Sequence, residues 1–259
     1  MSEVDHDGPR CGACGFEHEF GDMGAAVNGT NGFAECCPRC GFGYSTPPAQ
    51  RSDFDAIRDD DAFPMYSLSR EEVERRMPAL SLIEDREVRQ ATLDITGVAP
   101  PYFWIVPAST SGYHHPLCQE TRGLWAHTLM VVGAYQRLVD SYEERGLITH
   151  AERDLGLAAC ILHDQRKEGE PLRPKGSSTS DHDLKMADVV RDRMGDRVAD
   201  AIASHMGPWY DGPAPGTPLQ DLVHNADMMA STANVTVKVP GPVPEELASL
   251  GVEEEVLRS

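Results

Sequence analysis

Six histidine and aspartate residues lie in or at the ends of apolar, helix-like segments, and this pattern constrains the fold more than any other feature. An unpaired polar side chain costs free energy when it is buried. Polar groups that arrive from five such segments therefore indicate a shared partner or, alternatively, separate core and capping roles. Imidazole and carboxylate together suit a divalent first-row metal ion. The six are His127, His163, Asp164, His182, His205 and Asp227, with His115 just upstream.

The segments that carry these residues predict an all-α domain. Leu124, Thr128, Val131 and Tyr135 keep roughly helical spacing around His127. Thr217 and Pro218 are typical of an N-cap followed by the first helical residue. We expect helices over about 119–145, 151–164, 182–194, 196–206 and 217–231.

The chain upstream of these helices predicts two further elements. Ser69 begins a plausible N-cap and first turn. An apolar series after it indicates one helix docked on the main domain. The Pro-bounded aromatic stretch 100–107 predicts an extended segment that enters a loop at 108–118. The apolar series comprises Leu80, Leu82, Ile83, Val88 and Leu93.

The order of the polar residues resembles that of the HD-domain metal-dependent phosphohydrolases: a His, a His-Asp doublet and a distal Asp. Residues 79–232 carry the resemblance, which implies His127, His163-Asp164 and Asp227 as ligands of one metal ion. His182 and His205 fall where two-metal members of the family carry further ligands. The stretch from PASTSGYHHP to GLWAHT is similar to a family branch with a Ser- and His-containing loop.

The resemblance implies hydrolysis by metal-activated water, without a covalent intermediate. Asp164 would bridge two metal ions, which clamp the two ends of an in-line attack on phosphorus. We expect Asp164, Lys167 and His115 to be catalytic. Lys167 follows the doublet where the family usually has a Lys, and Arg166 stands where Gly is common.

A cationic loop after the doublet predicts a phosphate-binding segment. Four cations fall within ten residues of a chain whose net charge is −19. Gly and Pro residues make this segment a loop that could close over a phosphate. The alternative is a solvated loop. The four cations are Arg166, Lys167, Arg173 and Lys175.

Residues 1–46 predict a separate zinc ribbon. Two CxxC knuckles supply four thiolates at the spacing of a closed tetrahedral zinc site, and the zinc would provide the folding energy of so short a module. A pair of disulfides is the alternative, which an intracellular location disfavours. We expect an acidic linker at 47–68, an HD domain at 69–240 and an acidic tail at 241–259. The zinc ligands are Cys11, Cys14, Cys37 and Cys40.

The charge of the predicted ribbon and of the whole chain bears on whether the substrate is a small molecule or a nucleic acid. The ribbon carries two arginines against seven acidic residues, whereas a module that reads nucleic acid is expected to have a basic face. The strong negative charge also disfavours broad phosphate-backbone binding. So acidic a chain resembles proteins from salt-loving organisms. High salt screens charges over shorter distances, so under such conditions the negative charge would disfavour nucleic-acid binding less. A nuclease with the ribbon as its nucleic-acid-binding module is therefore the second hypothesis.

We expect a metal-dependent phosphohydrolase that acts on a phosphorylated, nucleotide-type small molecule. Its cofactors would be two divalent metal ions and one structural zinc ion. A non-enzymatic protein in which the metals only stabilise the fold would be expected to lack one of the metal ligands. All six are present, which disfavours this third hypothesis. The chain has no apolar N-terminal stretch for secretion and no run near the roughly 18 apolar residues of a membrane span, so a cytoplasmic location is expected.

Overall fold

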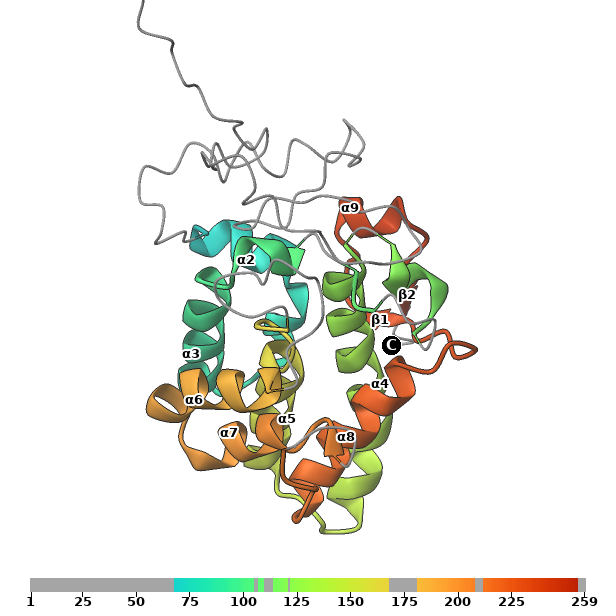
Figure 1. The fold of residues 1–259 in the computed structure, drawn as a ribbon. Helices are drawn as coiled ribbons and strands as arrows, with labels where there is room; N and C mark the ends of the chain where they lie inside the picture. Colours follow the sequence, from blue (N-terminus) through green and yellow to red (C-terminus); the bar gives the residue numbers. More distant parts are fainter. Residues whose placement is uncertain are drawn as a thin grey trace, which may run out of the picture.

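A computed structural model describes residues 68–104, 107–109, 114–120, 122–167, 181–207 and 212–255. The described chain is mostly helical, as expected for an all-α fold (Figure 1). Its elements are α2 (Arg70–Arg76), η2 (Pro78–Leu82), α3 (Arg86–Gly97), η3 (Pro101–Trp104), η4 (Pro116–Gln119), α4 (Gly123–Glu144), α5 (His150–Leu162), α6 (His182–Met194), α7 (Asp196–Ala203), α8 (Pro218–Ala230), β1 (Val239–Pro240), α9 (Glu245–Ala248) and β2 (Glu254–Glu255), where η denotes a 3-10 helix.

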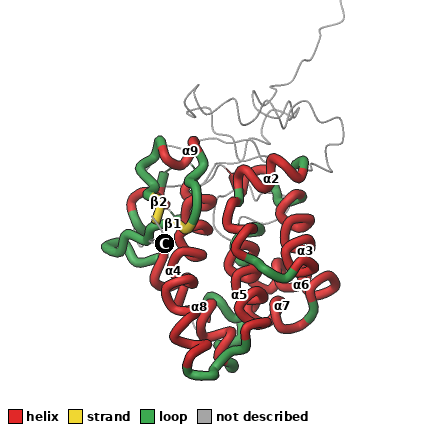
Figure 2. The backbone as a smooth tube through the Cα atoms, turned by 180° about the vertical axis from the view of Figure 1, so that it is seen from behind, coloured by secondary structure: helices red, strands yellow, loops and turns green. Residues whose placement is uncertain are grey.

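Helices α4 and α5 form the centre of the domain. Every residue of α4 from Gly123 to Tyr135 is buried, as expected for a helix that is apolar on all sides. It packs against α5, α8 and β1, and α5 also contacts α3, α7 and α8. Figure 2 shows α4 and α8 side by side, with α5, α6 and α7 beside them. The polar residues of the sequence pattern enter the structure at the ends and inner faces of these helices.

Local capping explains where the helices begin. Thr217 Oγ1 accepts a hydrogen bond from the backbone N–H of Gln220, and Gln220 Oε1 accepts one from the backbone N–H of Thr217, with Pro218 at the first helical position. Thr149 and Glu152 make the same reciprocal pair at the start of α5. Such capping boxes satisfy amides that the helix itself leaves unpaired. The five core helices lie close to their predicted ranges, although α4 begins at Gly123, after a left-handed Arg122.

Between residues 70 and 104 the structure differs from two of the predictions made from the sequence. The expected single helix is divided into η2 and α3, because Pro78 begins η2 and Asp85 caps α3 after a short extended stretch. The Asp154 carboxylate accepts a 2.6 Å hydrogen bond from the Asp85 amide, which fixes the start of α3 against α5. The stretch expected to be extended forms η3 over Pro101–Trp104, and the Trp104 ring packs edge-on against Trp125 of α4.

The segment predicted as an acidic tail packs on the helical core over residues 241–255. Strands β1 and β2 pair in parallel, with Val239 opposite Glu254. Leu247 of α9 is fully buried, and Glu246 pairs with Arg75 of α2 at 2.7 Å. The C-terminal segment, residues 236–255, therefore contacts α2 through Glu246 and α4 through β1.

The predicted zinc ribbon, with Cys11, Cys14, Cys37 and Cys40, and the linker up to residue 67 lie outside the described residues. Residues 168–180, which include Arg173 and Lys175 of the predicted phosphate-binding segment, lie outside them as well. Among the helices that are described, none is long and apolar enough to span a membrane.

Candidate metal centre

The six residues of the sequence pattern meet in the interior of the domain. His127 projects from the first half of α4, and His163 and Asp164 follow the last turn of α5. His182 begins α6, His205 follows α7, and Asp227 lies on α8. All six are buried, and all except Asp227 are at most 1% exposed. Packing among α4, α5, α7 and α8 brings these positions together.

One group of ligand atoms joins α4, α5 and α8. His127, His163 and Asp164 each offer one atom, and these atoms lie within 4.8 Å of one another. Asp227 extends the group, because its Oδ1 lies 3.0 Å from His127 Nε2 and 3.8 Å from His163 Nε2. Two imidazoles and two carboxylates around one point are a donor set for a divalent metal ion.

A second group shares Asp164 with the first. Asp164, His182 and His205 again place one atom each within 4.8 Å of the others. The Asp164 Oδ1 atom lies 3.1 Å from His182 Nε2 and 3.6 Å from His205 Nε2. The Oδ2 atom lies 3.5 Å from His163 Nε2 and 3.8 Å from His127 Nε2. The two oxygens of one carboxylate therefore face different sets of imidazoles.

Backbone hydrogen bonds set the tautomers of two of these histidines. His163 Nδ1 lies 2.8 Å from the Cys160 carbonyl oxygen, and His205 Nδ1 lies 2.7 Å from that of Ile202. Because a carbonyl oxygen only accepts, each Nδ1 carries the hydrogen and each neutral ring presents a lone pair at Nε2. Neither Nε2 makes a hydrogen bond to a residue that the structure describes. This orientation is typical of histidines that bind metal ions.

The electrostatics of His163 and of the two carboxylates favour the protonation states that a bound cation requires. Burial lowers the pKa of His163 to about 4. Burial alone would raise the pKa of Asp164, but the positive charge of Lys167 and the neighbouring histidines hold it well below its usual value. Burial of Asp227 is likewise outweighed by His127, so the pKa of Asp227 is also lowered. The site thus combines ionised carboxylates with a neutral imidazole at His163.

Lys167 lies inside the cluster. Its side chain is 9% exposed, and its Nζ lies 2.6 Å from Asp164 Oδ2. The expected role of Lys167 in binding a phosphate oxygen stays a prediction, as does that of the half-buried Arg166. The ion pair shows that Lys167 also compensates the charge of the shared carboxylate.

His114 lies beside the cluster, whereas His115 was the residue predicted to be catalytic. The ring of His114 contacts that of His127 edge-on, with 4.9 Å between centroids. His115 instead caps η4 by accepting a hydrogen bond from the Leu117 amide, and its Nε2 lies 3.2 Å from Thr236 Oγ1. Only the direction of the backbone before η4 distinguishes these neighbours, and no sequence signal indicated it.

His224 supports the cluster from outside. Its Nδ1 lies 2.6 Å from the His205 carbonyl oxygen. Its ring also packs on Gly207, whose φ of 56° makes the turn after His205. His224 lies one helical turn before Asp227 on α8 and contacts the backbone of the candidate ligand His205.

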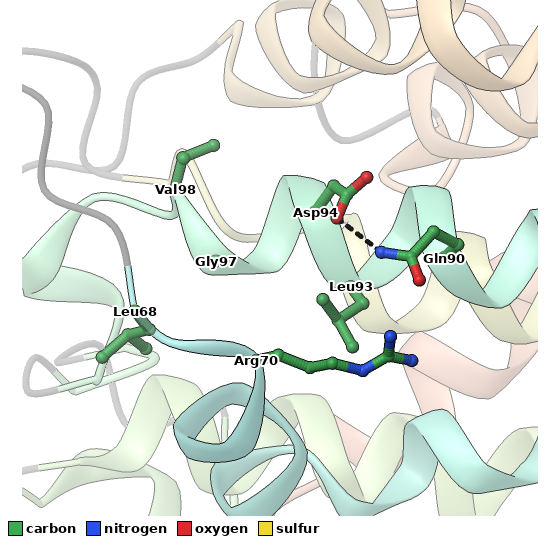
Figure 3. A pocket seen from close by; sticks show the side chains of 7 residues that line it. All are labelled: Leu68, Arg70, Gln90, Leu93, Asp94, Gly97 and Val98. Atoms are coloured by element: carbon green, nitrogen blue, oxygen red, sulfur yellow. Dashed lines mark hydrogen bonds between the residues drawn. The ribbon is translucent and has the colours of Figure 1, made fainter.

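Two surface pockets lie away from the histidines. One, of about 260 Å³, lies between the chain at Leu68 and α3 and is lined by Arg70, Gln90 and Asp94 among others (Figure 3). Its two polar residues on α3 already bond each other, with Gln90 Nε2 2.7 Å from Asp94 Oδ1. The other, of about 480 Å³, lies where the end of α4 meets the start of α8. Among the described residues, the two groups that share Asp164 are the ones whose donor atoms could hold a metal ion.

No protein-family model, curated protein or solved structure matches this chain.

Proposed function

We propose that the protein is a metal-dependent phosphohydrolase of the HD-domain type, which cleaves a phosphate ester or anhydride of a nucleotide-type substrate. The observation that carries the proposal is the sharing of Asp164 between two groups of imidazole and carboxylate donors. A structural metal site needs only one closed set of ligands. Two sets that share a carboxylate are typical of sites that act on phosphate groups.

The donors fit two divalent metal ions. His127, His163 and Asp227 would hold one ion, His182 and His205 the other, and Asp164 both. The buried lone pairs of His163 and His205 support this assignment. When bound, the ions would activate water and neutralise charge on the phosphoryl oxygens.

The remaining residues of the site orient these donors. The carbonyl groups of Cys160 and Ile202 fix the rings of His163 and His205, and Lys167 holds one oxygen of Asp164. In this proposal Lys167 also pairs with a phosphate oxygen of the substrate. The net charge of −19 favours a small phosphorylated molecule over nucleic acid.

A substrate screen tests this function. The full-length protein is stripped of metal, reloaded with one divalent metal at a time, and assayed against nucleotides and short labelled RNA and DNA. We expect phosphate release from nucleotides that depends on metal and is lost in Asp164→Asn, which keeps the shape of the side chain. Hydrolysis of RNA or DNA alone would favour the nuclease hypothesis. Activity unaffected by metal removal or by Asp164→Asn would refute both.

A further inference from the structure

His114 is a polar residue of the site that the two groups of ligand atoms do not include. It precedes η4 and is partly buried, with its ring against that of the candidate ligand His127. Its Nε2 lies 3.3 Å from Ser231 Oγ, and Ser231 Oγ lies 3.3 Å from Asp227 Oδ1. A chain of two hydrogen bonds therefore joins His114 to Asp227.

This chain defines the hydrogen positions on the His114 ring. An ionised carboxylate only accepts hydrogen bonds, so the single hydroxyl hydrogen of Ser231 goes to Asp227. The Ser231 oxygen then accepts from His114 Nε2, which carries the hydrogen of the neutral ring. His114 Nδ1 is consequently left with a lone pair and can only accept.

The acceptor on His114 Nδ1 has no partner among the residues that the structure describes, although the atom is buried. An unsatisfied buried acceptor costs free energy comparable to a lost hydrogen bond. An ionised phosphate oxygen is also an acceptor and cannot satisfy this atom. A hydroxyl group can.

The loop holds His114 from both sides. Gln119 Nε2 donates a 2.7 Å hydrogen bond to the His114 carbonyl oxygen. The next residue, His115, contacts Thr236 of the C-terminal segment. A side chain held in this way is preorganised for a contact with a ligand.

We propose that His114 is a substrate-contacting residue whose Nδ1 accepts a hydrogen bond from a hydroxyl group that the substrate carries near its reacting phosphate. This inference rests on the proposed function, because a phosphate at the candidate metal centre brings its neighbouring substituents toward His127 and His114. It narrows the substrate class to phosphorylated molecules with such a hydroxyl group, including ribonucleotides.

Removal of the hydroxyl groups and of the imidazole tests the contact. The metal-loaded, full-length protein is assayed with adenosine 5′-monophosphate and with its 2′,3′-dideoxy analogue. We expect kcat/KM to be about tenfold higher for the ribonucleotide, as is usual for one hydrogen bond between neutral groups. In His114→Ala this ratio should fall to about one. His114→Asn keeps an acceptor near the position of Nδ1 and should restore part of the ratio.

His115→Ala is the matched control, because His115 contacts Thr236 rather than the cluster. Its ratio between the two nucleotides should equal that of the wild type, whatever its overall rate. The metal content of His114→Ala should also equal that of the wild type. Loss of one metal equivalent in His114→Ala would show that His114 is a metal ligand. An unchanged ratio in His114→Ala would show that His114 does not contact the hydroxyl group. Either result overturns the proposal.

Two measurements do not depend on turnover. Nitrogen NMR of the metal-free protein should show the hydrogen of His114 on Nε2, and a hydrogen on Nδ1 would contradict the proposal. Calorimetry with phosphonate analogues, which cannot be hydrolysed, gives the same ribose-to-dideoxy ratio as affinities. If the wild type binds both analogues but hydrolyses neither nucleotide, the proposed function fails and the binding ratio alone decides the role of His114. If it binds neither analogue, both proposals fail.

Discussion

Asp164 occupies a position that no other residue of the cluster duplicates, because each of its oxygens faces a different set of histidines. Replacement of a candidate ligand that belongs to one group only, such as His205, leaves the other group intact. Replacement of Asp164 removes a donor from both groups at once. Replacement of Asp164 therefore tests directly whether the two groups work as one site.

We expect Asp164→Ala to abolish hydrolysis and to lower the metal content of the helical domain, while any zinc bound by the N-terminal cysteines remains. Elemental analysis of the purified protein and a phosphate-release assay measure the two effects. His150→Ala is the control, because the side chain of His150 is 65% exposed and pairs with Glu84 and Glu143 rather than with the cluster. Full metal occupancy or near-wild-type activity in Asp164→Ala would exclude the two-metal assignment.

Lys167 contributes to the site and to the stability of the metal-free protein. Removal of one partner of a buried ion pair leaves the other charge without compensation, which costs on the order of 3 kcal/mol. A bound cation would supply the missing positive charge. We expect Lys167→Ala to lower the melting temperature more in the metal-free than in the metal-loaded protein. It should also raise KM and lower kcat if its contact with phosphate strengthens in the transition state.

Lys185→Ala is the matched control for this prediction. Lys185 pairs with Asp181 at 2.9 Å, but its side chain is 38% exposed, so its loss should change stability by less than about 1 kcal/mol. Calorimetric melting of both variants with and without metal makes the comparison. Equal destabilisation of the Lys167 variant in the two states would show that no cation binds near Asp164.

Between elements, one close approach that depends on a glycine joins α4 to the C-terminal segment. A Cβ atom on Gly133 would collide with the backbone oxygen of Lys238 and lie 3.1 Å from Val237 Cγ1. A backbone atom cannot rotate away as the end of a side chain can, so the segment itself would have to move.

We therefore expect Gly133→Ala to lower the free energy of unfolding by about 2 kcal/mol, a usual cost of overpacking. Gly97→Ala at the end of α3 is the control, because its nearest neighbours lie 3.6 Å from the added Cβ. It should change stability by less than about 1 kcal/mol. Urea unfolding of both variants gives the two values, and equal stabilities would show that the C-terminal segment is not packed on α4.

A contact within α2 depends on pH. Hydrogen bonds from Arg75, opposed by burial and assisted by Arg76, lower the pKa of Glu72 from 4.5 to about 2. Since the carboxylate is favoured in the folded state, its contribution is complete above pH 4.5 and is lost as the pH falls toward 2. Solvent screening keeps this contribution modest.

Glu72→Gln should consequently melt at a lower temperature than the wild type at pH 7, and the difference should shrink as the pH falls to 3. Glu71→Gln, at the adjacent exposed position of α2, should melt like the wild type throughout. Melting curves over this pH range measure both. A difference that grows at low pH would have the wrong sign for a lowered pKa.

At the scale of the whole molecule, the cysteine knuckles and the helical domain are predicted to be separate folding units, joined by an acidic linker. We expect Cys37→Ser or Cys40→Ser to release one zinc ion without ending hydrolysis of a small nucleotide. Zinc analysis and the nucleotide assay measure the two effects. Loss of activity in either variant would place the cysteine module within the active domain.

The sequence by itself determined the core helices and the residues that gather between them. Capping residues such as Thr217 and helical spacing around His127 are local signals, and local hydrogen bonds decide helix ends. The cost of burying unpaired polar groups made the meeting of His163, Asp164 and Asp227 predictable. These inferences required only the identity and spacing of residues.

Only the tertiary structure decided what depends on contacts between distant segments. The division of the chain at Pro78–Asp85 rests partly on the contact of Asp85 with Asp154 of α5. The packing of Val237 and Lys238 depends on Gly133, and that of Glu246 on Arg75, although each pair is more than a hundred residues apart in the chain. The placement of His114 rather than His115 beside His127 depends on the backbone direction of one loop. Such contacts balance many weak interactions across the fold, and no local spacing records them.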